Sequence, residues 1–336
     1  MALATPLYPE IVCCIAIQRG GDNFRGVKTD TCPAIVPSGA AEIIRAYGNE
    51  ICVHLGGKHT GGQYTMFTDT TPPGGGPPPH FHVQEDEWWF VLEGRPSFLI
   101  GGRWREVPVG SSVFAPRDSL HTYKNVGDTP LRMLVNTAPS GFETFFKKSE
   151  AEFQTGGAPD MKRVREIGAE HGIFFPTIAP DDASRQGAPA LPSAVIRPAE
   201  GRICRLFGEE ITIQLDAKQT GGKFTVFVEV TPPGGGPPPH TLAIEDQWFL
   251  VLEGRVSFLA NGQWTDTPPG TGFFAPRKSV HTFKNIGDKP SRMLIHTSPS
   301  GIEKFFAVSH VEFAKPGGPD MAHVMTLAAE HGLKFV

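Results

Sequence analysis

Short runs of apolar and β-branched residues recur along the chain, separated by pairs of turn-forming residues. In the first half these runs span residues 64–67, 87–92, 96–100, 113–115, 121–125 and 132–136. Between them lie dipeptides that favour tight turns, namely Glu93-Gly94, Gly101-Gly102 and Gly127-Asp128. Many closely spaced short strands predict an all-β fold of the antiparallel barrel or jelly-roll type.

Helical spacing of apolar residues occurs near the end of each half. Residues 160–170 and 320–330 carry apolar side chains three or four positions apart. Each segment begins with an Asp suited to the N-cap position and is followed by a Gly. We therefore expect a short C-terminal helix in each half.

The same sequence pattern is present twice. The stretch from Thr71 to His80 recurs without a gap as Thr231 to His240, and residues 170–172 recur as 330–332 at the same offset of 160 residues. A period this long predicts two tandem copies of one domain rather than a solenoid. The expected organisation is an N-terminal extension with strand pairing (1–36), a first domain (37–175), a linker (176–197) and a second domain (198–336).

Composition and charge exclude several classes of protein. The 336 residues are 39% hydrophobic, which is enough for two cores, and a net charge of -4 with mixed signs provides no basic surface for nucleic acid. No apolar run reaches the roughly 18 residues of a membrane span, and the run 11–17 follows Glu10 rather than basic residues. We expect a cytoplasmic protein with no membrane or nucleic-acid partner. Its cysteines form no CxxC pair and are expected to be reduced: Cys13, Cys14, Cys32, Cys52 and Cys204.

Candidate metal ligands are concentrated in the first copy. His80 and His82 lie two positions apart, so on a strand their side chains share one face. Glu87 opens the next strand and His121 starts a later one. Three imidazoles and one carboxylate suit iron, manganese, nickel, copper or zinc, and they leave open positions on a five- or six-coordinate cation. We predict one divalent transition metal in the first domain.

The second copy keeps only part of this set. His240 and His281 are retained, whereas Leu242 cannot donate and Gln247 is a weak neutral ligand. We therefore expect a degenerate metal site in the second domain. His296 would compensate for the losses only if it faced His281.

Other residues are expected to have structural roles. Trp88 and Trp89 alternate faces on one strand, so one should join the core and the other an outer face or an interface. Asp69, like Glu229 in the second copy, is expected to form an ion pair rather than to line a pocket. The stretch 72–79, rich in Pro and Gly, is interpreted as a rigid lead-in that presents His80.

The order His80-x-His82-x4-Glu87-x6-Gly94, then Gly110-x5-Pro116-x4-His121-x3-Asn125, resembles the two paired motifs of the cupin superfamily. Two tandem copies resemble a bicupin, and the resemblance covers about four-fifths of the chain. It implies that the metal is held by His80, His82, Glu87 and His121. One departure is Asp118, with Lys278 in the second copy, at a position where the motif usually carries Gly. Asp tolerates a left-handed turn better than Lys.

Among bicupins, the resemblance is to dioxygenases of the quercetin 2,3-dioxygenase type. It implies a metal-dependent oxidoreductase that combines dioxygen with a flavonol-like or other enolisable small molecule, with Glu87 as catalytic base. Two alternatives stay open: a non-oxidative isomerase or decarboxylase, and a non-catalytic bicupin for small-molecule binding or storage. Cupins often pair through sheet edges, so a homodimer is a further expectation left open.

Overall fold

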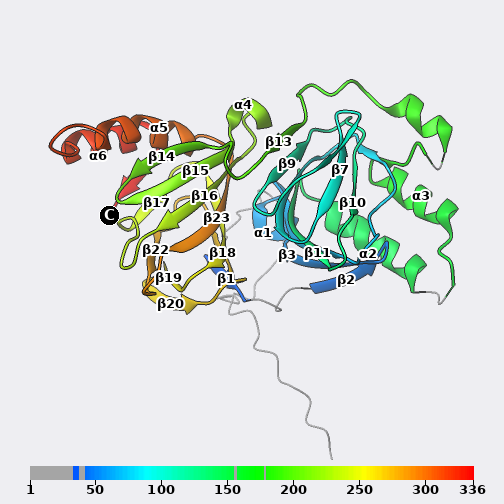
Figure 1. Ribbon diagram of the computed structural model, residues 1–336, viewed down its shortest axis with the longest axis horizontal. Coiled ribbons are helices and arrows are strands. Elements are labelled where there is room, and N and C mark those ends of the chain that lie inside the picture. The colour runs from blue at the N-terminus through cyan, green and yellow to red at the C-terminus, as the bar shows by residue number, and fades with distance from the viewer. Residues whose placement is uncertain (1–32, 38–41, 155–156, 178) are drawn as a thin grey trace, which may run out of the picture.

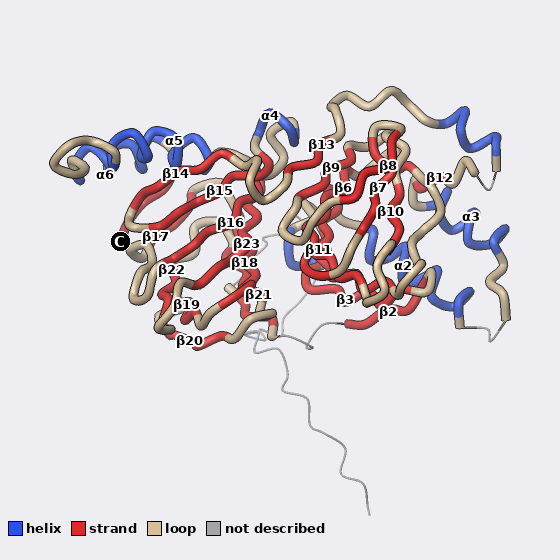
Figure 2. The backbone as a smooth tube through the Cα atoms, in the orientation of Figure 1, coloured by secondary structure: helices blue, strands red, loops and turns tan. Residues whose placement is uncertain are grey.

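The structure is a computed structural model that describes residues 33–37, 42–154, 157–177 and 179–336. Two domains of the same architecture lie side by side, with their longer helices at the outer ends of the molecule (Figure 1). Each domain contains a seven-stranded antiparallel sheet and a smaller antiparallel layer, the arrangement of a jelly roll (Figure 2). The predicted all-β fold class is confirmed. The expected strand at 11–17 and three of the cysteines, Cys13, Cys14 and Cys32, lie outside the described residues.

The large sheet of the first domain has the strand order β13-β9-β6-β11-β4-β3-β2. Its strands are β2 (Glu42–Ala46), β3 (Asn49–Leu55), β4 (Thr65–Thr71), β6 (Asp86–Glu93), β9 (Ser112–Ala115), β11 (Leu131–Ala138) and β13 (Ala194–Ile196). The smaller layer consists of β7 (Pro96–Ile100), β8 (Arg103–Glu106) and β10 (Thr122–Asn125), together with the pair β5 (Phe81–His82) and β12 (Ile173–Phe174).

The large sheet of the second domain repeats this order as β1-β21-β18-β23-β16-β15-β14. Its strands are β1 (Ala34–Val36), β14 (Arg202–Leu206), β15 (Glu209–Leu215), β16 (Thr225–Thr231), β18 (Asp246–Glu253), β21 (Gly272–Ala275) and β23 (Ser291–Ser298). Its smaller sheet consists of β17 (His240–Leu242), β19 (Val256–Ala260), β20 (Gln263–Thr267), β22 (His281–Asn285) and β24 (Leu333–Phe335).

Helices follow the last long strand of each domain. The predicted C-terminal helices are α3 (Met161–Glu170) and α6 (Met321–Glu330), and Asp160 and Asp320 cap them by accepting backbone N–H groups. Two longer helices, α2 (Phe142–Phe153) and α5 (Ile302–Phe313), were not predicted. The remaining helical segments are short: α1 (Gly57–Thr60), α4 (Ala217–Thr220) and the 3₁₀ helix η1 (Pro180–Arg185). Among the described residues, no helix is long and apolar enough to cross a membrane.

The two large sheets pack against each other and exchange edge strands. β1 precedes the first domain in sequence but pairs with β21 of the second, whereas β13 precedes the second domain and pairs with β9 of the first. A buried apolar cluster spans the interface, with Trp88, Phe90 and Phe114 from one domain and Trp248 and Phe274 from the other. Because edge strands and core are shared, the domains form one structural unit.

Buried polar groups cross the same interface. Lys223 of the second domain pairs with the buried carboxylate of Asp86, and in the mirrored position Gln63 donates to Asp246 (3.2 Å). Gln214 donates to the Gly110 carbonyl oxygen (2.8 Å). These hydrogen bonds satisfy groups that the sheet contact removes from water, so they fix how the two domains are aligned.

The Pro/Gly stretch before His80 lies along β10, as a rigid lead-in requires. Gly74 donates to the Asn125 carbonyl oxygen, and the Asn125 N–H donates to the Gly75 carbonyl oxygen (both 2.9 Å). Gly76 has a φ of 146°, and a Cβ there would clash with the Tyr123 backbone. The departure from the expected Gly is also accommodated, because Asp118 adopts a φ of 64° and donates its N–H to the His82 carbonyl oxygen (2.6 Å).

Candidate metal centre

The structure brings together the four residues that the spacing singled out. Glu87 lies in β6, His82 ends β5, and His80 and His121 are joined by a two-way backbone hydrogen bond at 3.0 and 2.9 Å. One ligand atom from each of His80, His82, Glu87 and His121 can be chosen so that all four atoms lie within 4.8 Å of one another. All four side chains are buried. This group has the composition and compactness to hold a metal ion.

Backbone carbonyls fix the tautomers of two of these histidines. Nδ1 of His80 donates to the Pro78 oxygen (2.9 Å), and Nδ1 of His121 donates to the Ser119 oxygen (2.7 Å). Each ring therefore presents the Nε2 lone pair to the centre of the group. Burial lowers the pKa of His80 well below its usual range and that of His121 to about 4. Both rings are thus neutral, which is the form that binds a metal.

His82 is the side chain of the four whose polar atoms are least satisfied. Its side chain is fully buried, yet neither ring nitrogen has a hydrogen-bond partner within the described part of the chain. The nearest carboxylates are Glu87 at 3.5 Å from Nε2 and Glu85 at 3.6 Å from Nδ1, both beyond good hydrogen-bond distance. A buried unsatisfied group costs about 1–3 kcal/mol. A cation between His82 and Glu87 would remove that cost, so the residues fit a metal.

Glu87 completes the group from the large sheet. One of its oxygens lies 3.2 Å from His121 Nε2. Burial raises the pKa of Glu87 to about 7, with His82 acting in the opposite direction. A bound cation would favour the ionised carboxylate.

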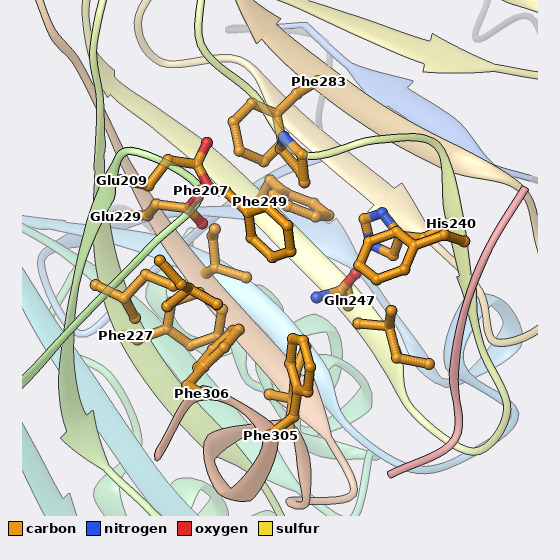
Figure 3. Close-up of a pocket in the computed structure, with 17 residues that line it drawn as sticks. Phe207, Glu209, Phe227, Glu229, His240, Gln247, Phe249, Phe283, Phe305 and Phe306 are labelled. Carbon is orange, nitrogen blue, oxygen red and sulfur yellow. The ribbon is translucent and has the colours of Figure 1, made fainter. Parts of the chain in front are cut away.

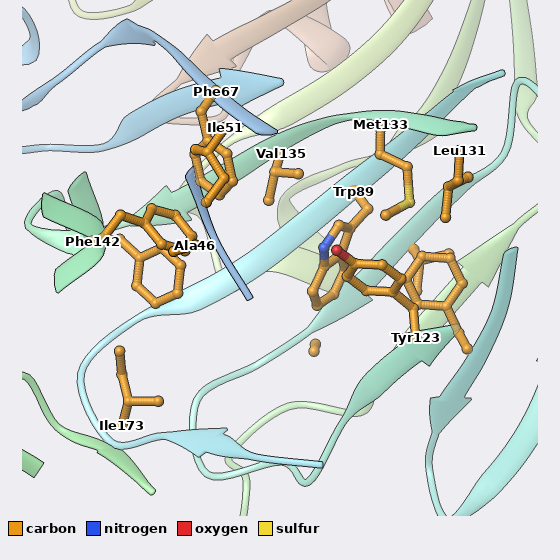
Figure 4. Close-up of a cluster of buried hydrophobic side chains, with 14 of the residues drawn as sticks. Ala46, Ile51, Phe67, Trp89, Tyr123, Leu131, Met133, Val135, Phe142 and Ile173 are labelled. Atoms are coloured by element: carbon orange, nitrogen blue, oxygen red, sulfur yellow. The ribbon is translucent and has the colours of Figure 1, made fainter. Parts of the chain in front are cut away.

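His80 and Glu87 of this group line a small cavity of about 50 Å³. Aromatic rings form much of its wall: Phe142 stacks on His82 at 4.9 Å between ring centroids, and the edge of Trp89 meets His121 at 5.4 Å. Figure 4 shows part of this wall within the apolar core of the first domain, including Trp89, Phe142 and Tyr123. An apolar wall strengthens electrostatic interactions inside the cavity.

A second polar cluster faces the same cavity and was not identified from the sequence. Tyr123 donates its hydroxyl hydrogen to Asp69, and Asn49 donates to Asp69 at 3.2 Å and to the Tyr123 oxygen at 2.9 Å. Burial raises the pKa of Asp69 to about 7 although these hydrogen bonds lower it, and burial also raises the pKa of Tyr123. The expectation that Asp69 forms an ion pair was wrong, because its partners are neutral. The sequence feature that pointed to this cluster was an acidic residue at the same position of both copies, Asp69 and Glu229.

The equivalent pocket of the second domain, whose lining residues Figure 3 shows, has the same volume of about 50 Å³ and different chemistry. His240 and His281 keep their carbonyl partners, Pro238 and Ser279, at 2.9 and 3.0 Å. Leu242 occupies the place of His82, and Gln247 contacts His281 at 2.7 Å. Among the described residues, only the group in the first domain combines three or more close His, Cys, Asp or Glu ligands.

His296 does not restore the second metal set. It is buried in the interface between the domains, with its ring 4.8 Å from Tyr64 and 5.2 Å from Phe224. Trp88 joins the same interface cluster, whereas Trp89 joins the core of the first domain, as strand alternation predicted.

Comparison with known proteins identifies the two halves. A family model described as the cupin domain matches residues 67–136 and 227–297. The polyketide synthase CurC of Streptomyces cyaneus is 26% identical over 98 residues, which is 29% of this chain, and the chain spans 62% of the length of that curated relative.

Solved structures with the same fold cover most of the chain. Protein Ylba from E. coli superposes with a TM-score of 0.57 at 12% identity, over 82% of this chain and 94% of that protein. Oxalate decarboxylase from Lactobacillus farciminis superposes with a TM-score of 0.55 at 15% identity, over 79% of this chain and 86% of that protein. Procruciferin, an 11S globulin from Brassica napus, superposes with a TM-score of 0.55 at 11% identity, over 80% of this chain and 85% of that protein. At such identities the likeness shows the fold alone.

Proposed function

The chain is a bicupin of the cupin superfamily, and on that premise we propose that its first domain is a metal-dependent enzyme acting on a small enolisable carbonyl or carboxylate compound, with dioxygen as co-substrate. The proposed ligands are His80, His82, Glu87 and His121. A bound divalent cation would polarise a substrate oxygen and offer open coordination positions.

The observation that carries this proposal is the state of His82. His296 is also buried with two unpaired ring nitrogens, but it lies in the domain interface, whereas His82 has Glu87 3.5 Å from its Nε2 and two histidines beside it whose lone pairs point to the same place. In the second domain Leu242 at that position belongs to the apolar core. The polar set therefore serves a bound ion rather than the core.

The chain's own residues provide proton transfer beside the proposed ion. The neutral Tyr123 hydroxyl and the Asp69 carboxyl share one hydrogen bond at the cavity wall, so they can hold a proton next to a substrate oxygen. Glu87 is proposed as the base that removes the substrate's acidic C–H proton, since a cation beside it would keep its carboxylate in the ionised form that accepts a proton. The aromatic wall keeps water away from the resulting anion.

The size of the cavity favours small substrates. A volume of about 50 Å³ suits a molecule of a few heavy atoms. Sites for drug-sized ligands run from roughly 300 to 1,000 Å³. This supports diketones, keto acids or dicarboxylates over the three-ring flavonols that the quercetinase resemblance suggested.

A second candidate is non-oxidative decarboxylation or isomerisation in the same site. The Asp69–Tyr123 pair favours it, because a proton donor at the cavity wall can reprotonate a carbanion without an oxidant. The metal ligands proposed are the same. Only the need for dioxygen separates the two reactions.

The test compares turnover with and without air. Protein loaded in turn with iron, manganese, nickel, copper or zinc is mixed with pentane-2,4-dione, small 2-oxo acids and oxalate while oxygen uptake and product are recorded. The primary proposal predicts oxygen uptake that is lost in His82→Leu and kept in His310→Ala, a surface control on α5. Product formed equally under nitrogen would establish the second candidate instead. Metal binding without turnover of any compound would make the protein a binding or storage bicupin.

A further inference from the structure

The pocket of the second domain contains two carboxyl groups that have no cationic partner. Glu209 in β15 and Glu229 in β16 are 4% and 5% exposed, and their carboxyl groups contact each other. Among the described residues, the one other side chain that hydrogen-bonds to this pair is Thr231, whose hydroxyl lies 3.4 Å from Glu209. No lysine or arginine occurs among the described residues that line this pocket. Burying two carboxyl groups without a cationic partner lowers the free energy of unfolding.

The first domain shows what was changed to create this pair. The positions equivalent to Glu209 and Glu229 hold Asn49 and Asp69, and that single carboxyl accepts hydrogen bonds from Asn49 and Tyr123. In the second domain Phe283 replaces Tyr123, so the hydroxyl donor is lost while a carboxyl is gained. The pocket of the second domain has thus exchanged internal donors for acceptors.

A buried histidine gives independent support for a ligand. His240 is 7% exposed and lines the pocket (Figure 3), with its Nδ1 hydrogen donated to Pro238. Its Nε2 lone pair faces the pocket without a hydrogen-bond donor in the described part of the chain. His281 Nε2 offers only a lone pair, because its Nδ1 hydrogen is donated to Ser279. Gln247, which is 3% exposed, therefore donates from its amide nitrogen to His281, and its amide oxygen has no hydrogen-bond donor in the described part of the chain. The pocket thus offers unused acceptors from His240 and Gln247.

The remaining wall is aromatic. Seven phenylalanines line the pocket: Phe207, Phe227, Phe249, Phe283, Phe305, Phe306 and Phe335. Phenylalanine faces attract cations, and the attraction is strongest where water is excluded. Carboxyl groups, a histidine lone pair and aromatic faces all favour a ligand that carries positive charge and N–H donors.

We infer that the second domain binds a small protonated amine, of the hydroxyalkylamine type, between the Glu209–Glu229 pair and His240. The ammonium group donates to the carboxyl oxygens, the alkyl carbons contact the phenylalanine rings, and the hydroxyl group donates its hydrogen to His240 Nε2 on the other side of the pocket. The pocket volume of about 50 Å³ limits the ligand to a few heavy atoms. A water needs roughly 10–15 Å³ by the same measure.

This inference does not depend on the proposed function of the first domain. It concerns different residues, and it requires no metal, since Leu242 removes one ligand position and no close ligand group is present in the described part of the second domain. Binding of the amine and binding of the metal can therefore be measured separately on the same chain.

The test is isothermal titration calorimetry of the full chain with ethanolamine. Ethylene glycol, which has the same number of heavy atoms but no charge, and ethylamine, which lacks the hydroxyl, serve as ligand controls. We expect ethanolamine to bind more tightly than ethylamine, and ethylene glycol not to bind. Equal binding of ethanolamine and ethylene glycol would overturn the inference.

Variants locate the site. Glu229→Gln keeps the shape of the side chain and should weaken ethanolamine binding by at least about thirtyfold, as expected when one member of a buried charge pair is removed. Asp69→Asn, the matched change in the first domain, should leave ethanolamine binding unchanged. Unchanged affinity in Glu229→Gln, or its loss in Asp69→Asn, would contradict the assignment. Should Glu229→Gln fold poorly, ethanolamine-dependent thermal stabilisation of the wild type, absent with ethylene glycol, provides the same decision.

Discussion

The two pockets of this bicupin occupy the same place in the same fold, and a few substitutions give them opposite chemistry. In the first, three imidazoles and Glu87 converge, and His82 is left with both ring nitrogens unpaired. In the second, Leu242 fills the position of His82 with carbon, and Gln247 turns a charged ligand position into a neutral one. A carboxyl pair, Glu209 and Glu229, stands where the first pocket has an amide and one carboxyl.

The backbone contacts around a site can be kept after its ligand side chains have been replaced. The carbonyl groups that orient His80 and His121 are matched by Pro238 and Ser279 in the second domain. The left-handed turn survives as well, with Lys278 at a φ of 67°. These features belong to the backbone and persist when side chains change. Function in each half therefore has to be argued from the side chains that line its own pocket.

The largest expected effect comes from giving the first domain the residue of the second. His82→Leu removes one of the proposed ligands and places a leucine where the second domain has Leu242. We expect metal affinity to fall by more than about a hundredfold, since changes in groups that only support ligands cost 10–100-fold. Elemental analysis after equilibrium dialysis measures this loss. An unchanged metal content would show that His82 is not a ligand.

The converse change should create a site. Leu242→His together with Gln247→Glu rebuilds the full ligand set beside His240 and His281, whose tautomers the backbone already fixes. We expect bound metal to rise from about one ion per chain to about two. Leu242→His alone supplies the matched control and should bind the added ion more weakly. No gain in the double variant would mean that the second scaffold cannot support a metal.

A smaller effect concerns stability and pH. Burial, together with repulsion from Glu229, raises the pKa of Glu209 to about 11, and burial raises the pKa of Glu229 to about 7 although its hydrogen bond with Glu209 lowers it. The folded state therefore binds more protons than the unfolded state above about pH 4.5, and this pair makes stability fall as the pH rises from there towards the raised pKa values. Glu209→Asn, the residue of the first domain, should make this fall smaller, because only Glu229 then remains, and stabilise the protein at pH 8 by about 1–3 kcal/mol.

Thermal unfolding at pH 5 and pH 8 tests whether the carboxyl pair lowers stability as the pH rises. The melting temperature of Glu209→Asn should exceed that of the wild type at pH 8, with a smaller difference at pH 5. Asn49→Ala in the first domain should instead destabilise, because it removes a donor from Asp69. A wild type that is more stable than Glu209→Asn at pH 8 would show that the carboxyl pair has a stabilising partner.

The smallest effect tests what the two halves share. Asp160 and Asp320 cap α3 and α6 with the same pair of backbone hydrogen bonds. Asp160→Ala and Asp320→Ala should each cost about 1 kcal/mol. Chemical denaturation of the two variants measures both. A large difference between them would show that the helices are not equivalent despite their common geometry.

Features that depend on one strand could be predicted from the sequence, whereas contacts between residues of separate strands could not. The ligand set could be inferred because His80 and His82 share a strand face, and the repeat showed which ligands the second copy lacks. The different locations of Trp88 and Trp89, in the interface and in the core, could be predicted because successive side chains alternate between the two faces of β6. Such inferences need only the period of a strand.

Features built from separate strands were missed. Asn49, Asp69 and Tyr123 come from β3, β4 and β10, so their contact depends on how the two layers close. The facing of His296 depends on the domain interface. The exchanged strands β1 and β13 are only three residues long, too short for a pattern to show. The helix α2 did leave a signal, in the helical spacing of Phe142, Phe145 and Phe146.

The central claim is that the first domain holds a metal and the second does not. The most direct measurement is a crystal structure of the wild-type chain grown with manganese, with anomalous scattering recorded at the manganese edge. The account predicts one anomalous peak, bound by His80, His82, Glu87 and His121, and none beside His240 and His281. A peak in the second pocket, or a first pocket without one, would contradict it.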